Sequence, residues 1–263
     1  KAHEVDNLAV TGDLVNLALD AEIELAKLWL ETLGAPENVS VVPGNHDAYV
    51  PGAFDKACRF WAAWMTGDGH LAHVDRHSFP YLRIREEVAL IGVSSARATA
   101  PFMANGFFRD DQSHRLGALL HKTAAKGIFR VIMIHHPPVR GAVAQHKRLF
   151  GIGNFQKTIL RHGAELVLHG HSHEPTLNWI RGKGDRWVPV VGVAAAGQSF
   201  GGSHPPGQWN LLEIAGGRDA WTLQLVRRGS AGPTIPVSEL ARVALIGNPD
   251  DATVMPDGFT VRP

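Results

Sequence analysis

The sequence lacks several features that would each point to a particular class of protein. It contains one cysteine, Cys58, among 263 residues, so an intrachain disulfide framework is excluded. No apolar stretch approaches the roughly 20 residues that a helix needs to cross a bilayer, and no signal peptide is visible at the start of the chain. These absences favour a chain without a membrane span in a reducing, cytoplasmic compartment.

An excess of charge of either sign is also missing. Lys and Arg together number 26 against 25 Asp and Glu, and no block of like charges stands out. Nucleic acid and membrane surfaces are therefore not the expected partners. A small-molecule substrate fits better, and a homo-oligomer is compatible with the composition. The length suits one large α/β domain or two small ones.

What the sequence does contain is four short apolar runs, each of which ends at residues that commonly bind metal ions. The four runs are Leu8–Val10 before Thr11-Gly12-Asp13, Val39–Val42 before Pro43-Gly44-Asn45-His46-Asp47, Val131–Ile134 before His135-His136-Pro137-Pro138, and Leu166–Leu168 before His169-Gly170-His171-Ser172-His173. Continuous apolar runs of this length predict buried parallel strands. Because ligands of open α/β sheets bind beyond the carboxyl ends of the strands, the four clusters predict one shared polar pocket.

The rest of the chain predicts an α/β domain followed by a strand-rich region. Helical spacing and end signals predict helices over residues 19–33, 54–65, 112–126 and 154–162, and a hairpin over 81–93. After His173, short strand-like runs alternate with glycine-rich turns. We expect a single domain over residues 1–229. For residues 230–263 we expect a mostly irregular tail with one short helical turn near Glu239.

The residue types in the four clusters suit a pair of metal ions. Asp13 follows a glycine and can bridge two cations, and Asn45 offers a neutral carbonyl oxygen. His135, His171 and His173 offer imidazole nitrogens, and in an extended segment the two side chains of His171 and His173 would point the same way. Nitrogen and oxygen donors without thiolate favour Mn, Fe, Zn or Co. Two such ions about 3.5–4 Å apart can hold and activate a phosphoryl group.

Four further residues are candidates for roles beside the metal ions. His46 directly follows Asn45 and can act as a general acid or a charge stabiliser, and Asp47 can orient its ring. His136 either contacts the substrate or only fills space. Arg140, like Arg97, either binds phosphate or is a solvated loop arginine. Each cluster taken alone also fits an ordinary polar turn, but four such turns at four strand ends would be an improbable coincidence.

Taken together and in this order, the clusters resemble the motifs of the calcineurin-like metallophosphoesterases. The matching pieces are Gly12-Asp13, Gly44-Asn45-His46-Asp47, His135-His136-Pro137 and Gly170-His171-Ser172-His173. The resemblance implies an α/β fold, a four-layer α/β/β/α sandwich of two mostly mixed β-sheets flanked by helices. It also implies that Asp13 bridges both metals, that Asn45, His135 and His171 hold one ion, that His173 holds the other, and that His46 assists the leaving group.

The expected function is therefore that of a metal-dependent phosphoesterase with a preference for phosphodiesters. A metal-activated hydroxide would attack the phosphorus of a small phosphodiester or phosphomonoester at a centre of two divalent ions, Mn, Fe or Zn. One departure from the family matters: its Asp-x-His motif, which lies before the Gly-Asp pair, is absent. We expect a missing upstream segment of one strand and one helix. The alternative is a non-catalytic or weakly active binding protein with an incomplete, one-metal site.

One motif of a different enzyme class also occurs. Gly197-Gln198-Ser199-Phe200-Gly201 matches the Gly-x-Ser-x-Gly nucleophile elbow of serine hydrolases. That motif needs a helix directly after it, whereas glycine- and proline-rich residues follow here, and no histidine occurs beyond His204 to complete a triad. We interpret it as a glycine-rich turn. Substrate specificity is expected from three loops, residues 66–79, 99–108 and 139–153.

Overall fold

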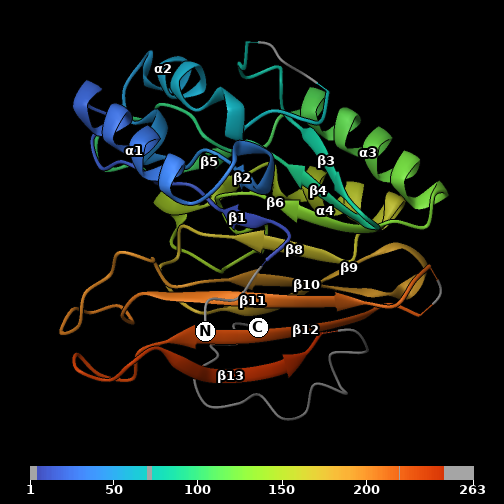
Figure 1. Ribbon diagram of the computed structural model, residues 1–263. Helices are drawn as coiled ribbons and strands as arrows, with labels where there is room; N and C mark the ends of the chain where they lie inside the picture. Colours follow the sequence, from blue (N-terminus) through green and yellow to red (C-terminus); the bar gives the residue numbers. More distant parts are fainter. Residues whose placement is uncertain (1–4, 70–72, 219, 246–263) are drawn as a thin grey trace.

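A six-stranded mixed sheet lies at the centre of the computed structural model, which describes residues 5–69, 73–218 and 220–245 (Figure 1). Its strand order is β3-β4-β6-β8-β10-β9. The bounds are β3 (Tyr81–Arg85), β4 (Val88–Gly92), β6 (Phe129–Met133), β8 (Leu166–His169), β9 (Leu177–Arg181) and β10 (Trp187–Gly192). The four inner strands run parallel, and β3 and β9 run antiparallel at the two edges.

The inner strands are buried on both faces. In β6, Val131 and Met133 belong to one hydrophobic core, whereas Ile132 belongs to a second core on the opposite face. Burial on both faces is why these strands have continuous apolar runs instead of an alternating pattern. The second core is closed by α3 (Asp110–Ala125) and α4 (Ile152–His162). The helices predicted over 112–126 and 154–162 are thereby confirmed.

The other face of the central sheet is covered by two separate ladders. β1 (Leu8–Val10) pairs in parallel with β2 (Val39–Val41), and β11 (Gln208–Ala215), β12 (Thr222–Gly229) and β13 (Ser238–Ala244) form an antiparallel sheet. Both ladders contribute side chains to the first core, with α1 (Asp20–Thr32) and α2 (Ala53–Phe60). Figure 1 shows α1 and α2 on the same side as β1 and β2, away from α3. The layered α/β fold is as expected, but the second sheet is divided into two ladders.

The remaining described elements are short. The 3-10 helices are η1 (Pro36–Asn38), η2 (His46–Ala48), η3 (Ala62–Trp64), η4 (Gln145–Lys147) and η5 (Lys183–Asp185), and a small parallel ladder joins β5 (Gly106–Phe107) to β7 (Leu149–Phe150). This ladder holds together two of the loops that we expect to set specificity. Among the described residues, no helix is both long and apolar enough to span a membrane.

A buried arginine fixes β2 against the edge of the central sheet. The Arg83 side chain, on β3, donates hydrogen bonds to the backbone carbonyls of Pro36, Val39, Ala63 and Thr66 at 2.7–2.8 Å. Beside it, the hydroxyl of Tyr81 donates to the carbonyl of Val41 at 2.8 Å. A buried charge is stable only where its hydrogen-bond donors have partners. The hydrogen bonds of Arg83 and Tyr81 to residues 36–41 hold β2 against the central sheet. The loop after β2 carries Asn45 and His46.

One expectation about the C-terminal region is wrong. Glu239 lies in strand β13 and not in a helical turn, because Ser238–Ala244 pairs along β12 with a register shift at Arg227/Arg228. Residues 246–263 of the predicted tail lie outside the described residues, and the domain boundary at residue 229 stays a prediction. The hairpin over 81–93 and the helix over 19–33 are confirmed as β3–β4 and α1.

Candidate metal centre

The ends of β1, β2, β6 and β8 meet at one edge of the two sheets. The backbone N–H of Gly170 donates to the carbonyl of His135 at 3.1 Å, which keeps the ends of β6 and β8 together. The Nδ1 atom of His135 lies 2.6 Å from the carbonyl oxygen of Thr11, which joins the end of β6 to that of β1. The polar residues that follow four strand ends, on two sheets, therefore converge at one site.

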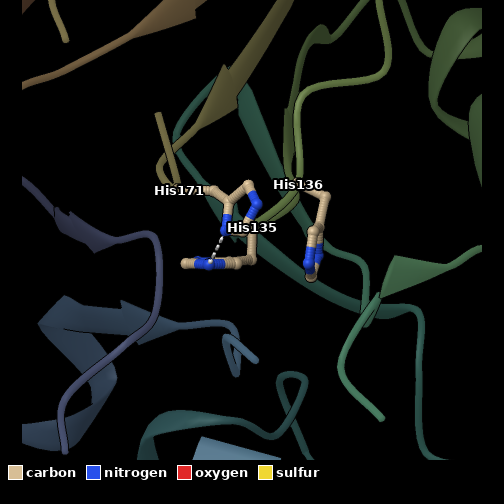
Figure 2. A group of neighbouring side chains, drawn as sticks. All are labelled: His135, His136 and His171. Carbon is tan, nitrogen blue, oxygen red and sulfur yellow. Dashed lines mark hydrogen bonds between the residues drawn. The ribbon is translucent and has the colours of Figure 1, made fainter. Parts of the chain in front are cut away.

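His135 lies at the centre of this site. Its Nε2 atom is 3.2 Å from Asp13 Oδ2, 3.2 Å from Asn45 Oδ1 and 3.2 Å from His171 Nδ1. Figure 2 shows the contact between the rings of His135 and His171, whose planes are inclined to each other by 69°. The exposed fractions of Asn45, His135 and His171 are 5%, 1% and 9%. Four of the five predicted ligands thus bring their donor atoms together, three of them buried and Asp13 partly buried.

Backbone carbonyls fix which ring nitrogen of His135 and of His171 points to the other donors of the cluster. A carbonyl oxygen only accepts hydrogen bonds, so His135 donates from Nδ1 to Thr11, and His171 donates from Nε2 to Lys147 at 2.9 Å. The nitrogen that is left with a lone pair, Nε2 in His135 and Nδ1 in His171, is the one that points to the other donors. Such partners behind the ligands are typical of histidines that bind metals.

The electrostatics of the site favour a bound cation. Burial works against ionisation of Asp13, but His135 and the backbone N–H of His46 hold the pKa of its carboxyl well below the usual range. Burial also opposes a charge on His135, yet the Asp13 carboxylate raises the pKa of that ring. Burial lowers the pKa of His171 to about 3, so this ring is neutral. An acid that stays ionised and a ring that attracts a proton together mark a position where positive charge is stabilised.

Two glycines allow the strand ends to approach this closely. Gly12 has φ +96°, and a Cβ atom on it would lie 2.6 Å from the backbone nitrogen of Gly44 and 2.8 Å from His135 Nδ1. Three of the predicted ligands also have left-handed backbones, with φ +59° at Asp13, +64° at His171 and +56° at His173. Unfavourable backbone conformations of this kind concentrate at functional sites, where the surrounding structure holds them.

Asp47 connects the loops after β1 and β2. Its Oδ2 accepts hydrogen bonds from the N–H groups of Asp13 and Gly44, at 2.9 and 2.7 Å, and its Oδ1 accepts from Leu14 at 2.8 Å and Val15 at 3.3 Å. The side chain is fully buried, and this burial, together with the charge of Asp13, raises its pKa to about 6. Asp47 therefore positions the Asp13 loop.

The ring of His46 has a different partner from the one expected. Its Nδ1 lies 2.6 Å from the carbonyl oxygen of Asn16, and the ring stacks on Tyr49 at a centroid distance of 5.8 Å. The expectation that Asp47 orients this ring is wrong, because both Asp47 oxygens are occupied by backbone N–H groups. With Nδ1 donating to Asn16, Nε2 of His46 is left as the nitrogen that can take up or release a proton.

His136 lies beside the cluster, as Figure 2 shows, but both of its ring nitrogens have protein partners. Nε2 lies 3.1 Å from the carbonyl oxygen of Ala104, and Nδ1 lies 2.8 Å from Ser95 Oγ. Although His136 could form a three-histidine metal group with His135 and His171, it has no lone pair free for an ion in this arrangement. Burial lowers its pKa far below the usual range, so the ring is neutral.

Among the described residues, no hydrogen bond joins the last two predicted site residues to the cluster. His173 is half-buried, and its ring packs at 5.4 Å against the ring of His204. Arg140 is exposed, and among the described residues it forms no hydrogen bond with any of the predicted ligands. Their predicted roles therefore stay predictions. The serine motif is also accounted for: Ser199 lies in an irregular stretch with no helix after it, as expected.

Sequence reasoning missed the groups that orient the donors. The carbonyls of Thr11, Asn16 and Lys147 hold the three histidine rings, and Ser95 holds His136. No residue type signals a carbonyl contact, because every residue has one. Ser95 follows β4, so its position at a strand end was the only available signal.

The donor set fits a divalent metal ion. Ligands about 2.1 Å from one ion lie roughly 3.0–3.4 Å from their neighbours, and the three separations from His135 Nε2 are all 3.2 Å. One carboxylate, one amide oxygen and two imidazoles match the ligand preferences of borderline metals. The cluster therefore suits a resident ion and not only a buried polar network.

Comparisons with known proteins identify the family of this chain. A probable cyclic nucleotide phosphodiesterase from Synechococcus sp. is 27% identical over 220 residues, which cover 81% of this chain and 74% of that protein. A dimetal phosphatase from Danio rerio aligns in structure with a TM-score of 0.42 and 12% identity, covering 85% of this chain and 88% of that one. The sequence pattern of the calcineurin-like phosphoesterases matches residues 1–175, which include all the predicted ligands. The chain belongs to the calcineurin-like phosphoesterase family.

Proposed function

We propose that this protein hydrolyses phosphodiesters at a centre of two divalent metal ions. The observation that carries the proposal is the convergence of Asp13, Asn45 and His171 on Nε2 of His135, each at 3.2 Å. These four residues would hold one ion. Asp13 would also contribute to a second ion together with His173. When bound, the ions would supply Lewis acidity, which lowers the pKa of water and offsets the charge on the phosphoryl oxygens.

The protein's own contribution is to fix its donors before a substrate arrives. The rings of His135 and His171 are locked by backbone carbonyls, and the carboxylate of Asp13 is held by the N–H of His46 at 2.9 Å. Donors that are already oriented need no rearrangement during the reaction, which is the main source of electrostatic catalysis. Asn45 adds an oxygen ligand without adding negative charge that would repel a phosphate.

His46 is the proposed proton donor to the leaving oxygen. The hydrogen bond to Asn16 and the stacking on Tyr49 hold its ring, with Nε2 as the nitrogen that exchanges a proton. A histidine in this position can protonate the departing alkoxide as the phosphorus–oxygen bond breaks. Asp47 keeps the loops of Asp13 and Asn45 in register and does not take part in the proton transfer.

Diesters are the proposed substrates because the relative from Synechococcus sp. carries the name of a cyclic nucleotide phosphodiesterase. Mn, Fe and Zn are the proposed metals, since two nitrogen donors and two oxygen donors converge without a thiolate.

The test is hydrolysis of bis(p-nitrophenyl) phosphate by the Mn²⁺-loaded protein. We expect turnover that stops when a chelator is added and returns with Mn²⁺. Asn45→Ala and His171→Ala should lose this activity, and Ser199→Ala should keep it. Loss of turnover in Ser199→Ala alone would overturn the metal mechanism. Mn²⁺ binding without any turnover would instead favour a binding protein built on this fold.

A further inference from the structure

A pocket lies near the candidate metal centre. It has a volume of about 340 Å³, which lies in the size range of small-ligand sites. Its polar lining includes three arginines against one carboxylate: Arg76, Arg97 and Arg109 against Asp55. Three guanidinium groups around one small pocket favour an anion, because carboxylates and phosphates match their planar donor geometry.

Arg97 is available to a ligand, because its side chain is exposed at the pocket. Its guanidinium lies 5.9 Å from the ring centre of Phe107 and 5.8 Å from that of Phe150, so two aromatic faces hold it at the pocket. Among the described residues it has no ion-pair partner. Arg109 differs, because its Nε is 3.0 Å from Asp111. Arg97 therefore presents a positive charge that is not engaged in an ion pair within the described structure.

The lining of the pocket includes close sequence neighbours of residues at the candidate metal centre, and the N–H of Ala48 donates to the carbonyl of Asn45 at 3.3 Å. Ala48 lines the pocket and ends the same 3-10 helix, η2, that begins with His46. Ser94 and Ala96 line it on either side of Ser95, whose hydroxyl contacts the ring of His136. Three peptide units separate Ala48 from Asn45, so their Cα atoms are at most about 11 Å apart. One small molecule can therefore reach from the metal centre into the pocket.

We infer that this pocket binds a second, non-reacting anionic group of the substrate, a carboxylate or a phosphate, while the scissile phosphoryl group lies at the metal centre. The inference rests on the proposed function for the position of the phosphoryl group. The substrates would then be phosphoesters that carry another negative charge a few bonds from the phosphorus. Its position beside His46 places the pocket on the side of the leaving alcohol.

The test measures binding and needs no turnover. Three phosphonates with a terminal carboxylate, phosphonoacetate, 3-phosphonopropionate and 4-phosphonobutyrate, are each compared with the ethyl, propyl or butyl phosphonate of matching length. Binding to the Mn²⁺-loaded protein is followed by titration calorimetry. For at least one length, we expect the carboxylate to lower Kd at least tenfold. Arg97→Gln should remove most of this preference, and Arg76→Gln should reduce it.

Arg161→Gln is the control, because Arg161 is exposed on α4 and does not line the pocket. It should leave the preference unchanged. Equal binding of the paired phosphonates at every length would overturn the inference, and so would a preference that survives in both Arg97→Gln and Arg76→Gln. Butyrate alone is a further probe: tight binding that Arg97→Gln abolishes would mean that the pocket takes a free anion and not part of the substrate. A protein that shows the preference but no hydrolysis would refute the proposed function and retain the pocket.

Discussion

The His135 cluster and the His173–His204 pair are both histidine-containing sites at the same sheet edge, but the protein holds their donors very differently. In the cluster, each ring is anchored by a backbone carbonyl and the donors lie 3.2 Å apart. In the pair, the rings pack at 5.4 Å, and His204 Nδ1 lies 4.0 Å from Glu174 Oε1. Among the described residues, the ring of His173 has no hydrogen bond. The cluster is preorganised for an ion, and the pair is not.

The difference follows from the backbone segments that carry the donors of each site. The cluster is formed by loops that continue from β1, β2, β6 and β8, and every residue of the last three strands is buried, so most of its donors follow rigid core strands. His204 follows a glycine-rich irregular stretch over residues 197–203, where little packs against the backbone. We therefore expect one ion to bind tightly and the other to depend on His173 more weakly.

The largest effect is expected for His135→Ala. This change removes the nitrogen on which the other three donors converge. Hydrolysis should fall roughly 1,000-fold or more. Loss of a residue that only hydrogen-bonds to a metal ligand already lowers activity about 10–100-fold, and His135 is a proposed ligand itself. His173→Ala should cost less, roughly 10–100-fold, and keep one equivalent of Mn²⁺ by elemental analysis, whereas His135→Ala should keep none. Equal losses of metal and activity in the two variants would show that the two sites are not distinct.

The next effect concerns stability. Asp47→Asn replaces a carboxylate oxygen with an NH₂ group that must face backbone N–H groups, two of which donate to each oxygen. Hydrogen bonds to charged groups contribute about 1.5–3 kcal/mol each, so the free energy of unfolding should drop by about 3 kcal/mol. Urea denaturation of the metal-free protein at pH 8, above the Asp47 pKa of about 6, measures it. Asp55→Asn, at an exposed position, is the control and should change little.

The contrast also shows how far the sequence could be interpreted. Asp13, Asn45, His135 and His171 were identifiable because each follows an apolar run, and parallel strands bring such positions together. His173 also follows an apolar run, and its side chain was expected to point the same way as that of His171 in an extended segment. The backbone at both residues is left-handed and not extended, so that expectation does not apply. The partner of His46 was not identifiable, because Asn16 contributes a carbonyl and not its side chain.

The C-terminal region shows where prediction from local sequence preference fails. Ser238–Ala244 contains good helix formers, Glu239, Leu240 and Ala241, and local preference alone favoured a helical turn there. Pairing with β12 overrides that preference, since burial against a neighbouring strand outweighs intrinsic propensity. The buried network of Arg83 was equally unpredictable, because its acceptors are backbone carbonyls from two separate segments, residues 36–39 and 63–66.

The third prediction uses the metal as a ligand that stabilises the fold. Free Mn²⁺ at 100 times its Kd should stabilise the native state by about 2.7 kcal/mol. For a chain of this size that corresponds to a rise in Tm of about 5–10 °C. His135→Ala should abolish the rise, and His173→Ala should retain most of it, because the cluster stays intact. A rise of the same size in His135→Ala would mean that Mn²⁺ binds elsewhere.

The smallest effect is expected for His204→Ala. The ring packs against His173 but stands on a loosely held segment, so its loss should change hydrolysis less than threefold and leave the Mn²⁺ content unchanged. His114→Ala, at an exposed position on α3, is the matched control. A loss of one Mn²⁺ equivalent in His204→Ala, but not in the control, would show that the pair closes around an ion when metal is present. The difference between the two sites would then lie in the order of assembly, with the cluster formed in advance and the pair completed by the metal.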